Sequence, residues 1–224
     1  MRRAVLMALS LLLIAVPCFA ASGRAMPAGT ACGELDLRNG TVVSYEQMVT
    51  DIARRKGLSV EEVKREIPDI AGQLNASGDG SGRERTSYTY DGLRCAYFYL
   101  RDSLQVTEEY RPTISLYCAG WYHPKVATMK TGIVEIVNAD LEREYKGVTK
   151  QFAGTLFVHL QSEFRLHWDI NGDFFDNGAT SVEGGGQLNL KTGEGGRVIF
   201  RVDAGSELKH YKYCHTYGDI RYGG

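Results

Sequence analysis

The sequence predicts a mainly β protein, an antiparallel sandwich or a barrel-like fold, with a small helical hairpin near its N-terminus. Three observations lead to this prediction. Short runs rich in Tyr, Phe, Ile and Thr recur from about residue 85 onward. Gly-rich turns separate several of them, as at 184–186 and 192–196. Helical patterns are confined to the segment before these runs, which argues against a parallel sheet with helical crossovers.

The first twenty residues have the three parts of a secretory signal. Arg2 and Arg3 precede an apolar run over 4–16, and Cys18-Phe19-Ala20 has the small-x-small pattern of a cleavage site. The apolar run is shorter than the ~20 residues that a membrane-spanning helix requires. We therefore expect cleavage near Ala20, a secreted or periplasmic location, and no transmembrane segment in the mature chain.

Two capping boxes predict the helical hairpin. Ser44 and Ser59 each stand three residues before a Gln or Glu, the spacing that starts a helix. Gly57 predicts the end of the first helix, and Pro68 the end of the second, because the residue before proline avoids the α conformation. The expected parts of the chain are a signal peptide (1–20), an N-terminal segment (21–40), the helical hairpin (41–75), a Gly/Ser-rich linker (76–84) and a β-rich domain (85–224).

The β-rich domain holds the strand-like runs, and their tyrosines are expected to pack in the core or across strands, with a ligand platform as the alternative. The runs are 87–90, 94–101, 113–122, 132–138, 147–160, 164–170, 187–190, 197–202 and 209–215. Tyr211 and Tyr213 alternate with His210 and Lys212. This alternation predicts that both rings lie on the apolar side of the last strand.

Four cysteines remain once the signal is removed: Cys32, Cys95, Cys118 and Cys214. An even number in an exported chain predicts two disulfides, and three pairings are open. Cys95 and Cys118 lie in runs expected to be neighbouring strands, which favours that pair and leaves Cys32 with Cys214. A zinc site is the alternative, but the sequence lacks a C-x-x-C spacing.

Residues 52–64 resemble the helix-turn-helix motif of bacterial DNA-binding proteins. The matching residues are Ala53, Gly57 and Val63. Glu61 and Glu62, however, stand where a recognition helix would meet phosphates. The formal net charge is −1, and becomes −3 without the signal, because Arg2 and Arg3 leave and no acid does. We therefore interpret the segment as two packed helices and expect no nucleic-acid partner.

Polar and apolar residues alternate from 155 to 170. The polar positions of this alternation include His159, Glu163, His167 and Asp169, residue types used in general acid–base or metal-assisted hydrolysis. These four are candidate catalytic residues, although a solvated sheet face explains the same pattern. Along one extended strand, His159 and His167 would be too far apart to share a ligand, and a bend at 161–162 would redirect half of the run.

A partial calcium-loop pattern overlaps this run. Asp169, Asn171 and Asp173 match its opening, but Phe174 and Thr180 stand where the loop needs a glycine and a bidentate acid. Asn171-Gly172 is also typical of a two-residue hairpin turn, and we favour the hairpin. We therefore expect no cofactor, with calcium as the alternative.

The sequence contains neither a G-x-S-x-G elbow nor an H-E-x-x-H motif. We therefore predict a secreted, disulfide-stabilised β-rich module that binds an extracellular ligand without catalysis. The ligand would be a glycan, a peptide or an envelope protein. The alternative is a secreted hydrolase with a His/Glu/Asp site, with or without a metal.

Overall fold

A computed structural model describes residues 35–36, 40–76, 93–123, 126–203, 205 and 207–221. The predicted signal peptide, Cys32, nearly all of the linker and the predicted strand at 87–90 lie outside the described residues.

Three helices follow two short strands, β1 (Leu35–Asp36) and β2 (Thr41–Val43), at the start of the described chain. The helices are α1 (Tyr45–Lys56), α2 (Val60–Glu66) and α3 (Ile70–Ala76). Both predicted capping boxes are present, at Ser44 and at Ser59. Gly57 ends α1 with a φ of 65°, a left-handed conformation that glycine adopts without steric cost. The second helix ends before Pro68, as predicted.

The strands form two large sheets and one small ribbon, and the predicted mainly β, antiparallel sandwich is confirmed. The five-stranded sheet has the order β11 (Gln187–Lys191), β5 (Val126–Glu142), β4 (Thr113–His123), β3 (Arg94–Ser103) and β2 (Thr41–Val43). The six-stranded sheet has the order β1 (Leu35–Asp36), β13 (His210–Arg221), β9 (Arg165–Phe175), β8 (Gln151–Ser162), β12 (Gly195–Asp203) and β10 (Ala179–Val182). The ribbon pairs β6 (Glu144–Tyr145) with β7 (Val148–Thr149), and a 3-10 turn (Glu183–Gly186) precedes β11. Neighbouring strands are antiparallel except β1 and β13, which are parallel.

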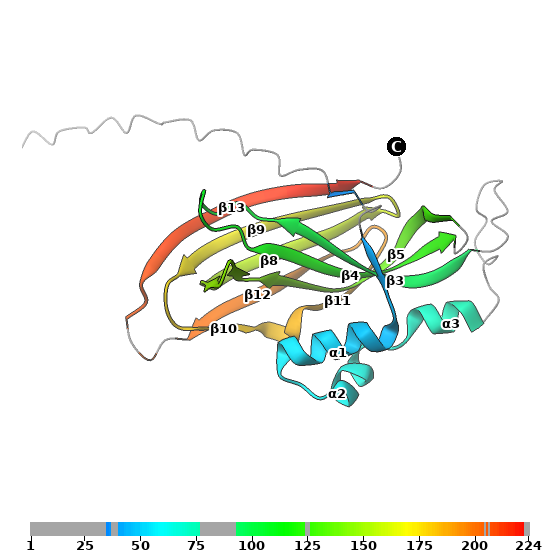
Figure 1. Cartoon of the computed structure of the whole chain (residues 1–224), viewed down its shortest axis with the longest axis horizontal. Coiled ribbons are helices and arrows are strands. Elements are labelled where there is room, and N and C mark those ends of the chain that lie inside the picture. The colour runs from blue at the N-terminus through cyan, green and yellow to red at the C-terminus, as the bar shows by residue number, and fades with distance from the viewer. Residues whose placement is uncertain are drawn as a thin grey trace, which may run out of the picture.

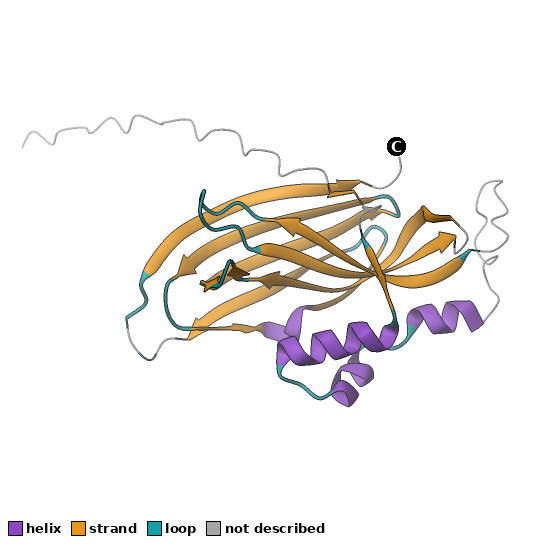
Figure 2. Cartoon of the chain, viewed as in Figure 1, coloured by secondary structure: helices purple, strands orange, loops and turns teal. Residues whose placement is uncertain are grey.

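Two hydrophobic cores hold three layers together. One core lies between the sheets and contains Phe98, Leu116, Leu156 and Trp168. The other joins the five-stranded sheet to the helices, which lie along one side of the molecule (Figures 1 and 2). Because helices cover the five-stranded sheet, the outward side chains of the six-stranded sheet form the larger open sheet surface.

The helix-turn-helix resemblance has a packing explanation. The buried residues of α1 and α2 are Met48, Val49, Ile52, Ala53 and Val63, and all belong to the helix-side core. The matching spacing therefore places small and aliphatic side chains against the five-stranded sheet. Glu62 is used in the capping box at the exposed start of α2.

The predicted hairpin at Asn171-Gly172 is wrong, because both residues lie inside the continuous strand β9. Gly172 pairs with Gly154 of β8, and a Cβ at either glycine would come within 2.8 Å of the Phe152 ring. The glycine pair thus makes room for a buried aromatic ring. The hairpin turn instead lies at Glu163-Phe164, between β8 and β9.

The predicted Cys95–Cys118 disulfide is also wrong. Cys95 pairs in register with Trp121 and faces the helix-side core, whereas Cys118 pairs with Phe98 and faces the core between the sheets. The two are therefore free thiols on opposite faces of one sheet. Cys214 also lies in the core between the sheets. Its pairing with Cys32 stays a prediction, since Cys32 is outside the described residues.

Candidate functional site

The candidate site is the outer face of the six-stranded sheet, meaning the outward side chains of β8, β9, β12 and β13. These strands lie side by side in Figure 1. Alternate residues such as Leu160, Leu166 and Trp168 are fully buried, so the residues between them point outward. The outward residues include Phe157, His159, His167, Asp169, Asn171, Asp173, Tyr213, His215, Tyr217 and Asp219.

The hairpin between β8 and β9 brings two predicted site residues together. His159 pairs directly with His167 across the strands. The expectation that these histidines lie too far apart is therefore wrong. It assumed one extended strand, whereas the turn at Glu163-Phe164 folds the run back on itself, close to the bend considered at 161–162. A bulge near Gln161 adjusts the register.

Asp219 orients His167 from β13, on the side of β9 opposite to β8 and His159. His167 Nδ1 lies 3.0 Å from Asp219 Oδ1, and Arg165 Nη2 donates to Asp219 Oδ2 at 3.1 Å. Partial burial acts to raise the pKa of Asp219, but the bonds from His167 and Arg165 outweigh it and lower the pKa. Asp219 therefore serves as an ionised acceptor that holds the imidazole in place.

Two further His–Asp pairs cross from β13 to β9. His215 Nε2 lies 3.1 Å from Asp169 Oδ2, and His210 Nε2 lies 2.8 Å from Asp173 Oδ1. Between them, the Tyr213 hydroxyl donates to Asn171 Oδ1 at 3.0 Å. These contacts restrict the rotamers of polar side chains on an open surface.

The structure separates the other predicted site residues. Glu163 lies at the hairpin tip, with its side chain 3.2 Å from the position that a Cβ on Gly132 would take. Asp169 lies one outward position beyond His167 and bonds to His215. The four candidate catalytic residues therefore do not converge on one point.

The calcium-loop pattern also forms part of a strand. Asp169, Asn171 and Asp173 are alternate outward residues of β9, roughly 6.5–7 Å apart, and so do not surround one ion. Within the part of the chain that the structure describes, no group of three or more His, Cys, Asp or Glu side chains is placed to hold a metal.

A bulge in β13 corrects the prediction for the last tyrosines. The register shifts between His210 and Lys212, so Tyr211 turns inward and packs on Tyr110, whereas Tyr213 turns outward. Tyr213 is 47% exposed and Tyr217 is 58% exposed. The tyrosines of β3 and β4 do pack in or beside a core: Tyr97, Tyr99 and Tyr117 at the helix-side core, and Tyr122 at the core between the sheets.

Sequence reasoning did not single out Asp219, and it ended the last strand at 215. The signal was present, because Tyr213, His215, Tyr217 and Asp219 share one parity. Extending the alternation by four residues would have placed all of them on one face of the strand, and the bulge between His210 and Lys212 makes that face the outer one.

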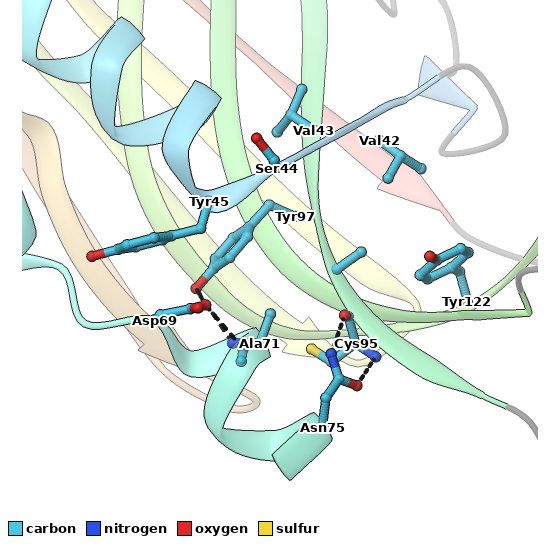
Figure 3. Close-up of a pocket in the computed structure, with 12 residues that line it drawn as sticks. Val42, Val43, Ser44, Tyr45, Asp69, Ala71, Asn75, Cys95, Tyr97 and Tyr122 are labelled. Carbon is cyan, nitrogen blue, oxygen red and sulfur yellow. Dashed lines mark hydrogen bonds between the residues drawn. The ribbon is translucent and has the colours of Figure 1, made fainter.

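A second concavity lies between β2, α3 and the start of β3 (Figure 3) and has a volume of about 420 Å³. Asn75 accepts from the Cys95 N–H and donates to the Cys95 carbonyl, both at 2.9 Å, as a paired strand would. The Tyr97 hydroxyl donates to Asp69 Oδ1 at 3.1 Å. These polar groups join α3 to β3, so we assign this pocket to the packing of the helical layer.

Among the described residues, no helix is both long and apolar enough to cross a membrane. No protein-family model, curated protein or solved structure matches the chain.

Proposed function

We propose that the chain is an exported, non-enzymatic module that binds a glycan polymer on the outer face of its six-stranded sheet. One observation supports this most directly. The face carries exposed tyrosine rings beside carboxylate, amide and imidazole groups that cross-strand hydrogen bonds hold in position. Side chains that are ordered before binding lose less entropy when a ligand arrives.

The chemistry of the face suits a sugar. A tyrosine ring offers a flat apolar surface with a polar tip, and it gives large contact area at low entropic cost. Tyr213 and Tyr217 stand four residues apart on β13, which places their Cα atoms roughly 13 Å apart. Asp169 and Asn171 on the neighbouring strand offer acceptors to hydroxyl groups. This arrangement fits an extended chain of sugar rings lying along β13.

The charges of the face favour a neutral ligand. Asp169 and Asp173 each bond to a histidine, and Asp219 bonds to both Arg165 and His167. Of these contacts, the Arg165–Asp219 ion pair cancels charge and so reduces the field that would select a strongly charged peptide. The hydrolase alternative has less support, because Glu163 lies away from the two adjacent histidines.

A panel of soluble polysaccharides and cell-wall fragments, measured by affinity electrophoresis and calorimetry, tests the proposal. We expect a neutral glycan to bind, and Y213A and Y217A each to weaken binding by about tenfold or more, as the loss of a central aromatic contact does. F164A is the matched control, because Phe164 is also 47% exposed but lies at the hairpin tip.

Two results would overturn the proposal. One is that none of the glycans binds. The other is that Y213A and Y217A bind a glycan as tightly as F164A does. A peptide that binds and is lost in the tyrosine variants would assign the face to a protein partner instead.

A further inference from the structure

A row of residues crosses the outer face at its end nearest the β8–β9 turn. Strand register places Asp219 of β13, His167 of β9, His159 of β8 and Gly195 of β12 side by side. Directly paired residues on antiparallel strands have Cβ atoms about 4.5–5.5 Å apart. The Cβ atoms of His159 and His167 are therefore close enough for both side chains to reach one small ion between them.

The hydrogen bond to Asp219 prepares one imidazole for this role. A carboxylate only accepts, so His167 must donate from Nδ1 across the 3.0 Å contact. In the neutral ring, Nε2 then carries a lone pair that is directed away from Asp219. A histidine that ligates a metal usually donates its other ring N–H to a carboxylate in this manner. Arg165 holds the same carboxylate at 3.1 Å and keeps it from turning away.

The open side of the row is at His167 and Asp219. On the other side, Gly195 of β12 has no side chain of its own, but the Phe157 ring lies over it, with its centroid 6.3 Å from that of the His159 ring. His167 and Asp219 keep side-chain exposures of 26% and 31%. Coordination positions beyond the two nitrogens therefore open to solvent.

The other His–Asp pairs of the face lack this arrangement. Asn171 lies opposite His215, and Phe175 lies opposite His210, so neither histidine has a second imidazole across the strand. The face thus contains one row suited to a metal and two similar histidines that serve as internal controls.

We propose that His159 and His167 form a surface site for a borderline divalent transition ion of the Zn²⁺ and Cu²⁺ class, with Asp219 as the positioning residue and water in the remaining coordination positions. Imidazole nitrogen suits these ions, whereas Ca²⁺ and Mg²⁺ prefer oxygen ligands. Affinity should follow the usual order, with Cu²⁺ bound more tightly than Zn²⁺. The proposal is independent of the glycan proposal, which rests on Tyr213 and Tyr217.

Calorimetric titration of the full chain with Zn²⁺, and electron paramagnetic resonance with one equivalent of Cu²⁺, test this site. We expect one Zn²⁺ per chain and a Cu²⁺ spectrum with two equatorial nitrogens. H159Q and H167Q should each weaken Zn²⁺ binding by at least ~10-fold, and D219N by ~10–100-fold, the usual cost of losing an outer partner. H210Q and H215Q should leave the affinity unchanged, and Ca²⁺ should not compete.

Three results would overturn the proposal: wild-type protein that binds no Zn²⁺, H159Q that binds it as tightly as wild type, or H210Q and H215Q that lose as much affinity as H159Q. Circular dichroism melting of each variant shows whether the fold is retained. These substitutions are on the solvent face, so the melting temperature should change little.

Discussion

At the residue scale, Arg55 in α1 connects the helical layer to the five-stranded sheet. Its guanidinium lies 2.6 Å from Asp51 Oδ2 and 2.8 Å from Glu142 Oε1, and it donates to the Tyr99 hydroxyl at 2.7 Å. It also lies over the rings of Tyr99 and Tyr117. Because the side chain is only 20% exposed, removing it would leave the partly buried Asp51 and Glu142 with only the more exposed Arg54 and Arg101 as cationic partners.

We expect R55M to lower the free energy of unfolding by about 2–4 kcal/mol, since breaking a largely buried ion pair leaves uncompensated charge. Denaturant titration measures the change. R54M is the matched control, because Arg54 pairs with the same Asp51 but is 75% exposed, and its loss should cost under about 1 kcal/mol. Equal losses in the two variants would contradict the role assigned to Arg55.

The R55M variant should also shift the pH at which acid unfolds the protein. Burial acts to raise the pKa of Asp51, but hydrogen bonds from Tyr117 and Arg54, together with Arg55, lower it overall. A carboxyl with a lowered folded pKa stabilises the fold above its unfolded pKa and loses that effect as pH falls through the folded pKa. Without Arg55, the acid-unfolding midpoint should move to higher pH, and an unchanged midpoint would argue against this linkage.

Some residue roles were predictable from sequence and others were not. Ser44 and Ser59 act through residues three positions away, so their caps follow from local spacing alone. His159 and His167 are brought together by a turn whose position the alternation did not reveal. Asp219 reaches His167 from a strand more than fifty residues away in the sequence, and no local pattern contains that contact.

At the element scale, β9 is continuous because two glycines meet beneath Phe152. A Cβ on Gly172 would lie 2.7 Å from the Gly154 Cα and 2.8 Å from the Phe152 ring. Asn-Gly is a strong turn signal in isolation, but here the glycine is required by packing across the strands. Tertiary packing therefore overrides the local turn preference.

We expect G172A to destabilise the protein by about 3 kcal/mol or more, since the added methyl meets backbone atoms that do not move aside easily. Thermal and denaturant unfolding measure the loss. G205A is the control, because a Cβ at Gly205 has open space around it, and its effect should stay within about 0.5 kcal/mol. A G172A variant as stable as G205A would show that β8 and β9 can separate at this point.

Strand β13 shows a second limit of sequence reasoning at this scale. Alternation predicts that all odd-numbered residues of a strand lie on one face. The bulge between His210 and Lys212 moves the odd-numbered residues that follow it to the other face. Tyr211 and Tyr213 consequently lie on opposite faces. Most of the long strands were predicted, but β2 lies in the segment predicted as helical and β10 was not predicted. The face of each residue near a bulge depends on the pairing partner.

At the scale of the whole molecule, Cys95 and Cys118 lie in different hydrophobic cores. Cys95 is 4% exposed in the helix-side core, and Cys118 is fully buried between the sheets. Burial raises the pKa of Cys95 to about 12 and also raises the pKa of Cys118. Neither thiol is therefore available as a reactive thiolate in the folded protein.

We expect Cys95 and Cys118 to resist a thiol reagent at pH 8 in the native state and to react after unfolding in guanidinium. Peptide mass mapping assigns the label to each cysteine and so reports on each core separately. Rapid labelling of either residue in native protein would contradict the buried placement, and a Cys95–Cys118 disulfide in the purified protein would contradict the sheet register.

The sequence by itself determined the class of the fold, the helix starts and most of the strand positions, because capping, turn and period-two signals act over a few residues. Only the tertiary structure decided which residues meet. It placed His159 beside His167, separated Cys95 from Cys118 and brought Asp219 to the outer face. The physical reason is that alternation specifies a side within one strand, whereas register between strands depends on turn position, bulges and the fit of buried rings such as Phe152.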